Sequence, residues 1–384
     1  MLTALKLYFR KPMTIVGIIT ALMFQIIFSV IWMTAYSGVT ERSSNLKIAI
    51  VNEDSDTGKT IAQELEGKLP FQIVTGLTAT EAQKRLNDRE LQMVMEIPAD
   101  FTARLTSPTE KAEIRYTINE ANPMTIKSIM QGVEQSVTAT INSQAAEHGT
   151  EAILTQANMP AAAAEQTARS LTGKVESHVT SIHPVNGMNN QMVPMMMVLA
   201  TFVGSMIMGL NLQQSTMALG NQAGKWSKFG ARVLINVGSA LVVSLVGTAL
   251  ITVLGGQMEQ GFGLLWLYEA LLMLTFMFFT QMFLIVFGMP GMFFNITMLS
   301  IQLVSSGAMV PREMLNGFYQ HLGAFLPATY AVNGIMSLQL GGPGAGHAAG
   351  VLALILAVCL AVALLATALK RKPAAAPAVM PETA

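Results

Sequence analysis

The stretch ALLMLTFMFFTQMFLIVFGMPGMFFNITMLSIQLVSSGAMVP (270–311) contains 42 residues and no charged side chain. A helix needs about 20 apolar residues to cross a bilayer core, so this stretch is long enough for two crossings. Glycine and proline interrupt helices, and the sequence Gly288-Met289-Pro290-Gly291 divides the stretch. The stretch therefore predicts two membrane helices joined by a very short connection.

Four further apolar runs predict spans at roughly Met13–Met33, Met192–Leu212, Val233–Leu254 and Gly350–Leu369. Hydrophobic residues make up 52% of the 384 residues and charged residues 12%, whereas soluble domains have about 25% charged residues. We therefore expect an α-helical polytopic membrane protein with six transmembrane helices. The alternative for the first run is a cleaved signal peptide, but its apolar stretch of about 20 residues is longer than is usual for one. Residues 1–10 are expected to form a short interfacial helix.

The charged residues predict the orientation and a domain outside the membrane. Of the 23 acidic residues, 19 lie between Ser37 and Asn190, together with 13 of the 23 basic ones. Lysine and arginine in short loops favour the cytoplasmic side. With six spans, three basic clusters all face the cytoplasm, and both termini lie there. The clusters are Lys6, Arg10 and Lys11; Lys225, Lys228 and Arg232; and Lys370, Arg371 and Lys372.

Residues 37–190 are accordingly predicted to be an extracytoplasmic domain between helices 1 and 2. Strand-like pieces at 46–52, 71–75, 91–98 and 112–119 alternate with helix-like pieces, which is typical of a small α/β layer. Residues 124–179 have a polar, helical pattern. The expected organisation is an N-terminal unit (1–36), this domain (37–190), a membrane domain (191–372) and a disordered cytoplasmic tail (373–384).

The residues that carry chemistry in enzymes show no matching pattern. Cys359 is the single cysteine, and the five histidines lack metal-ligand spacing. Asp54-Ser55-Asp56 resembles the start of a calcium loop but lacks the glycine at the sixth position. Gly58-Lys59-Thr60 resembles the end of a phosphate loop, yet Glu53 stands where its first glycine belongs. We expect no enzymatic activity, no cofactor, no metal and no nucleic-acid partner.

The segment SSGAMVPREMLNGFYQHLGAFLPATYAVNGI (305–335) resembles the outer loop of ABC type-2 (ABC-2) permeases, the membrane subunits of ATP-binding-cassette exporters. The stretches at 48–69 and 81–107 resemble the outer domain of that superfamily. HPVNGMNNQMVPMMMVLATFVGSMIM (183–208) is similar to the phage-infection-protein (YhgE/Pip) branch. The resemblance covers nearly the whole chain. Its matching residues predict an outer re-entrant segment at about 311–340, marked by Gly307, Pro311, Met314, Leu315, Leu326, Pro327, Thr329 and Tyr330. Within it, Met314, Leu315, Phe318 and Leu322 recur at helical spacing, which predicts one re-entrant or interfacial helix with an apolar face.

The resemblance implies a permease subunit in the cell membrane that works as a homodimer or heterodimer with a separate ATP-binding subunit. The exported substrate would be amphipathic or a cell-envelope component. In the resembling family, the loop between the second and third spans couples the permease to the ATPase. Aromatic and arginine side chains are typical contact anchors, so this loop is predicted to act through Lys225, Trp226, Lys228, Phe229 and Arg232. The alternative for the same residues is anchoring in the lipid headgroup region.

Polar residues inside the predicted spans are candidates for a translocation path. Glu269 is an acidic residue near the outer end of its span, and charges within membranes are often functional. Asn295 and Gln302 are further candidates, although such amides also bond neighbouring helices. The alternative function is a non-transport surface protein, either an anchor or a phage-receptor-like protein, whose outer domain binds a partner.

Overall fold

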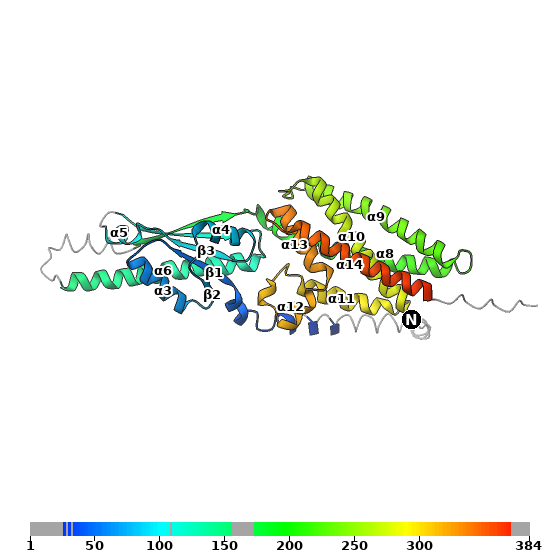
Figure 1. The fold of residues 1–384 in the computed structure, drawn as a ribbon, viewed down its shortest axis with the longest axis horizontal. Helices are drawn as coiled ribbons and strands as arrows, with labels where there is room; N and C mark the ends of the chain where they lie inside the picture. Colours follow the sequence, from blue (N-terminus) through cyan, green and yellow to red (C-terminus); the bar gives the residue numbers. More distant parts are fainter. Residues whose placement is uncertain (1–25, 28–29, 32–33, 108–109, 156–172, 370–384) are drawn as a thin grey trace, which may run out of the picture.

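The computed structural model describes residues 26–27, 30–31, 34–107, 110–155 and 173–369. It is elongated, with an α/β domain (residues 41–182) at one end and a bundle of long helices at the other (Figure 1). Most of the predicted first span, the interfacial helix at 1–10 and the tail at 373–384 lie outside the described residues. Between residues 26 and 36, the described residues are helical, and Ile31 and Ala35 pack against Leu315 and Tyr319.

The α/β domain is built on a five-stranded sheet of order β2-β1-β3-β4-β5. β1 is parallel to β2 and β3, β3 is antiparallel to β4, and β4 is parallel to β5. The four predicted strands are present, and β5 is an addition where the sequence predicted helix. β5 is an edge strand with mostly exposed side chains, so it lacks the apolar alternation that identifies strands. The strands are β1 (Lys47–Asn52), β2 (Gln72–Val74), β3 (Met93–Ile97), β4 (Ala112–Asn119) and β5 (Val175–Ile182).

Helices cover both faces of the sheet because the buried strands alternate their apolar side chains. Ile48 and Ile50 of β1 pack with α3 (Thr57–Lys68), α5 (Phe101–Thr106) and α6 (Met124–Thr155) on one face. Ala49 and Val51 pack with α4 (Ala79–Asn87) on the other. The apolar residues of α6 recur at helical spacing, which gives this long helix a stripe that faces the sheet. These residues are Ile126, Met130, Val133, Val137 and Ile141.

Within the described residues, four helices are long and apolar enough to cross a membrane. They are α8 (Gly187–Ala218), α9 (Lys225–Val253), α10 (Phe262–Phe287) and α14 (Ala345–Leu369). α10 lies at the centre, in contact with α8, α9, α13 (Pro327–Leu340) and α14. It begins eight residues before the uncharged stretch. Glu269, which precedes that stretch in the sequence, is buried within the helix and does not mark its end.

The break at 288–291 occurs where the sequence predicted it, since α10 ends at Phe287 and α11 covers Gly291–Ser305. α11 has 15 residues. Its length of about 22 Å is less than the roughly 30 Å of a bilayer core. The expectation of six full-length spans is therefore met in part. α11 is followed by the short helices η2 (Arg312–Met314) and α12 (Gly317–Gly323) before α13.

Candidate functional site

The predicted coupling residues lie at the start of α9 rather than in a loop. α8 ends at Ala218, Gly224 is the N-cap of α9, and Lys225 to Arg232 form its first two turns. Figure 1 shows the α8–α9 turn at the end of the bundle that is remote from the sheet. The turn is thus separated from the α/β domain by the length of the membrane helices.

Contacts with neighbouring helices fix this end of α9. Arg232 is buried and donates to Gln213 Oε1 (2.7 Å) and Thr216 Oγ1 (3.1 Å) near the end of α8. Lys228 donates to the Gly220 carbonyl oxygen. Cations are favourable at helix C-termini because the carbonyl oxygens there carry partial negative charge. Lys228 and Arg232 therefore hold the α8–α9 turn in place.

The two aromatic residues at this end have different surroundings. Phe229 is 9% exposed and packs against Ile285 and Ala363, so it belongs to the bundle core. Trp226 is 53% exposed, and the Lys225 ammonium lies 5.8 Å from the centre of its ring. Trp226 is therefore available for an intermolecular contact, whereas Phe229 is not.

The predicted re-entrant segment turns back toward the α/β domain after α11. Gly307 has a φ of +83°, a conformation that glycine adopts without strain. Pro311 precedes η2, and Pro327 is at the start of α13. Thr329 donates to the Gly323 carbonyl oxygen (2.7 Å) and fixes α12 against α13.

The expected single amphipathic helix through Met314, Leu315, Phe318 and Leu322 is wrong. Met314 lies in η2 and is buried in the core of the α/β domain, whereas Leu315 is buried against Ile31 and Tyr319. Phe318 lies in the first turn of a separate helix, α12, and is 65% exposed. Helical spacing could not reveal that Met314 and Leu315 pack into two different cores.

The start of α13 is joined to the central helix. The Tyr330 hydroxyl donates to the Ala324 carbonyl oxygen (2.7 Å), and the Tyr330 carbonyl oxygen accepts from Tyr268 of α10 (2.7 Å). A Cβ placed on Gly334, one turn further along, would lie 2.0 Å from the Tyr268 hydroxyl oxygen. The close approach of α13 to α10 therefore depends on this glycine.

The three candidate path residues are buried and bond to different neighbours. Glu269 Oε2 accepts from Thr201 (3.4 Å), Asn295 donates to the Thr280 carbonyl oxygen (3.1 Å), and Gln302 Oε1 accepts from the Ala328 backbone (3.1 Å). Within the described part of the chain, one polar atom of each side chain has no hydrogen-bond partner: Glu269 Oε1, Asn295 Oδ1 and Gln302 Nε2.

Backbone amides of the protein bind both oxygens of the Asp54 carboxylate. Asp54 Oδ1 accepts from the amides of Asp56 (2.9 Å) and Gly58 (3.1 Å), and Oδ2 accepts from the Thr102 amide (2.9 Å). Burial tends to raise the pKa of Asp54, but these hydrogen bonds outweigh it and lower the pKa below its ordinary value. The carboxylate thus caps α3 and α5.

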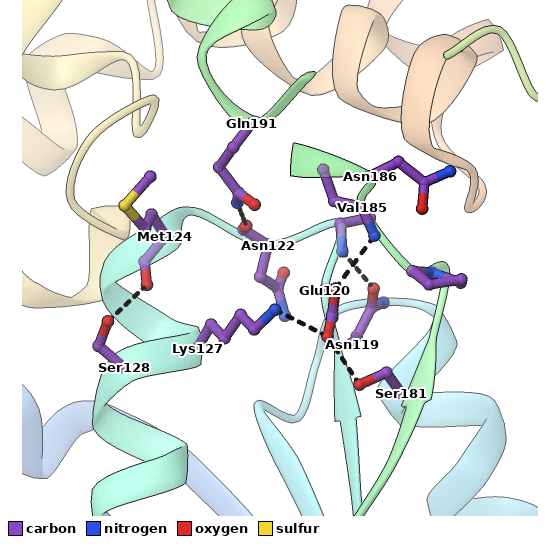
Figure 2. Close-up of polar contacts among 12 residues, drawn as sticks. Asn119, Glu120, Asn122, Met124, Lys127, Ser128, Ser181, Val185, Asn186 and Gln191 are labelled. Carbon is purple, nitrogen blue, oxygen red and sulfur yellow. Dashed lines mark hydrogen bonds and ion pairs between the residues drawn. The ribbon is translucent and has the colours of Figure 1, made fainter. Parts of the chain in front are cut away.

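A polar junction that the sequence did not predict connects the sheet to the membrane helices (Figure 2). Glu120, just after β4, pairs with Lys127 of α6 (2.9 Å) and accepts from Ser181 of β5 (2.8 Å) and the Val185 amide (3.1 Å). Burial tends to raise the pKa of Glu120, but the bonds from Lys127, Val185 and Ser181 lower it overall. Glu120 therefore fixes the chain that leads from β5 into α8. Its position after a strand offered no pattern that would predict this role.

Further hydrogen bonds attach the α/β domain to the segment between α11 and α12. Arg42 donates to the Met314 carbonyl oxygen (2.7 Å), Asn45 to that of Glu313 (2.9 Å), and Thr125 to that of Met309 (2.8 Å). On α8, Gln191 donates to the Asn122 carbonyl oxygen (2.9 Å), as Figure 2 shows. The domain is therefore docked on the bundle at several places.

Residues 15–368 match the family described as ABC-2 family transporter protein. The chain belongs to this family. The resemblance predicted from 305–335 is thereby confirmed. Membership, together with the long apolar helices, supports a multi-pass membrane protein.

Two individual proteins are also similar to this chain. An uncharacterized protein of Bacillus subtilis (strain 168), YhgE, is 27% identical over 177 residues. The alignment covers 45% of this chain and spans 22% of the length of that relative. A crystal structure of a domain assigned to an ABC type-2 transporter of Thermotoga maritima MSB8 is 21% identical, with a TM-score of 0.28, and the match covers 35% of this chain and 85% of that one.

Proposed function

We propose that this chain is the membrane-spanning permease subunit of an ATP-binding-cassette exporter. In this proposal it crosses the cell membrane six times, with cytoplasmic termini and the α/β domain outside. It works as a dimer and moves an amphipathic or cell-envelope substrate outward, and a separate chain hydrolyses ATP. Family membership supports the transport role. The basic residues Lys225 and Lys228, at the end remote from the α/β domain, support the orientation.

The observation that carries the proposal is the exposed Trp226 on a firmly held helix start. Lys228 and Arg232 bind the end of α8, and Phe229 anchors α9 in the bundle core. A contact at Trp226 can therefore move α8 and α9 together. Exposed tryptophan side chains are strong anchors in protein interfaces.

The test compares two exposed aromatic residues at opposite ends of the bundle. The protein carrying Trp226→Ala is purified from its native host in a mild detergent, and the co-purifying ATPase is quantified by mass spectrometry. We expect at least a tenfold loss of ATPase, the size of a strong interface contact. Phe318→Ala on α12 is the matched control and should retain it. Equal ATPase recovery from both variants would contradict the proposed contact.

Glu269, Asn295 and Gln302 are the proposed polar positions of the translocation path. Their unpartnered atoms support this role, because an unsatisfied buried polar group is costly unless another state of the protein satisfies it. All three are buried within one protomer, so the proposal requires α10 or α11 to move when the path opens.

A further inference from the structure

A cavity of about 450 Å³ lies between the α/β domain and the α13–α14 region of the bundle. The α/β domain contributes Arg89 and Asn122, and the segment after α11 contributes Arg312. Tyr330 and Asn333 of α13 and His347 of α14 also line it. The remaining polar lining residues are Asp88, Gln92, Glu313 and Ser337. Three separate parts of the chain therefore place nitrogen donors around one space.

Two of these donors are guanidinium groups without a carboxylate partner. In the described part of the chain, no aspartate or glutamate oxygen lies within 4.0 Å of Arg89 or Arg312. Each arginine uses one nitrogen to bind a carbonyl oxygen, Arg89 that of Gly341 (3.1 Å) and Arg312 that of Gln320 (2.7 Å). Burial lowers the pKa of Arg89 to about 10, so it stays charged at neutral pH. Two cations thus face the cavity, and its two acidic lining residues, Asp88 and Glu313, are exposed and form an ion pair with neither of them.

The buried atoms without hydrogen bonds at this cavity are all donors. They are Arg89 Nε, Arg312 Nε and Asn122 Nδ2, which have no acceptor among the described residues. Asn122 is 4% exposed, so bulk water has little access to its side chain. A buried donor without an acceptor costs free energy. A bound group that is rich in acceptors and negatively charged would satisfy these three donors.

The position and the remaining lining indicate an amphiphile. The cavity lies beside the first turn of α14, at Gly344 and His347, where a spanning helix would meet the headgroups of the bilayer. The amides of a helix N-terminus also favour an anion. Ile126, Met336 and Ala348 provide apolar surface next to the arginines.

We infer that this cavity binds the phosphate group of a phosphorylated amphiphile, with Arg89 and Arg312 as its charged ligands and Asn122 as a further donor. Phosphate oxygens accept hydrogen bonds from guanidinium groups, often from two nitrogens of one side chain. Asp88 and Glu313 are exposed at the rim, where an amine in the same headgroup would find partners. The inference concerns binding and holds whether or not the chain partners an ATPase.

The experiment measures binding of defined probes to the full-length protein in an uncharged detergent by native mass spectrometry. Dioleoyl phosphatidylglycerol is the probe, and dioleoylglycerol has the same acyl chains without phosphate. We expect the phospholipid to bind and each of Arg89→Gln and Arg312→Gln to weaken binding by about tenfold, the usual effect of losing a charged hydrogen bond. Arg85→Gln is the control, since Arg85 lies on α4, four residues before Arg89, but pairs with Glu81 at the surface.

Each outcome decides the inference. Equal phospholipid binding by the wild type and both cavity variants would overturn it, as would equal binding of dioleoylglycerol, because the acyl chains alone would then account for binding. Arginine-dependent binding of soluble glycerol phosphate would support the site and assign it to a water-soluble source. Absence of binding to any probe would mean that the cavity holds only water and would also overturn it.

A second measurement uses the wild-type protein, so it does not depend on variants that fold. Phenylglyoxal modifies arginine side chains, and peptide mass spectrometry locates the adducts. Phosphatidylglycerol should protect Arg89 and Arg312 by at least severalfold compared with dioleoylglycerol, and should leave Arg104 unprotected, because Arg104 is exposed on α5. Equal modification of Arg89 and Arg312 with both probes would contradict the inference.

Discussion

His183 is the residue through which pH is expected to affect the attachment of the α/β domain. Its Nε2 lies 2.7 Å from Asn87 Oδ1, and a Cβ on Gly341 would lie 2.3 Å from its Nδ1, so the ring is held between α4 and the turn after α13. Burial, followed by the nearby charge of Arg89, lowers the pKa of His183 below its ordinary 6.5, against an opposing effect of Glu259.

Protonation therefore favours the unfolded state. The contribution of neutral His183 to stability is complete above pH 6.5 and is lost as the pH falls through the lower pKa of the folded state. We expect the apparent melting temperature in detergent to fall more between about pH 7.5 and pH 5.5 for the wild type than for His183→Asn, because asparagine does not titrate. Asparagine also tolerates the positive φ of this position. Equal falls for both proteins would contradict this role.

Single residues differed in how far the sequence alone could predict their role. The Asp54 turn was recognised as a poor calcium loop, because its local spacing is visible in the sequence. Arg89 and Arg312 are far apart in the chain, and each has an ordinary polar neighbourhood. Their meeting at one cavity depends on how the α/β domain docks, which no local pattern encodes.

At the level of helices and strands, Gly334 controls how closely α13 packs on α10. Gly334→Ala would place a Cβ about 2.0 Å from the Tyr268 hydroxyl oxygen and displace its hydrogen bond to Tyr330. Overpacking of this kind typically costs about 1–3 kcal/mol. We expect the apparent melting temperature of the detergent-solubilised protein to fall by several degrees, as measured by the fraction that stays monodisperse after heating.

Gly350→Ala on α14 provides the comparison, because a Cβ there meets nothing within 4 Å. It should leave the melting temperature unchanged or raise it slightly, since alanine favours helix more than glycine does. A similar loss in both variants would show that the close contact at Gly334 is not responsible.

Hydrophobic runs predicted the four long membrane helices and the first four strands of the sheet, since each has a clear pattern of its own. β5 has no such pattern, because most of its side chains are exposed. The segment from η2 to α12 was predicted as one helix because its apolar residues have helical spacing. The chain bends there so that Met314 can enter the α/β domain, which is a tertiary effect.

For the whole molecule, the proposed orientation predicts which surfaces meet the exterior. In a protein without Cys359, a cysteine at the exposed position Thr60 of α3 should react in intact cells with a thiol reagent that cannot cross membranes. A cysteine at the exposed position Ser227 of α9 should react only after the cells are opened. Labelling of both positions at equal rates in intact cells would be incompatible with the orientation. Labelling in opened cells serves as the control for reactivity.

Because β5 leads directly into α8, a tilt of this helix would link movement at its two ends. Glu120 and Gln191 attach one end of α8 to the α/β domain, and Lys228 and Arg232 attach the other end to α9. Pro194 lies inside α8 near the end attached to the α/β domain, and a proline within a helix removes a backbone hydrogen bond and favours a bend there. From there to Ala218 the arm measures about 36 Å, so a tilt of about 5° would displace the Trp226 end by about 3 Å. Under the proposed contact at Trp226, a displacement of that size at one end of α8 would also tilt the part of α8 before Pro194, and the α/β domain attached to it would move.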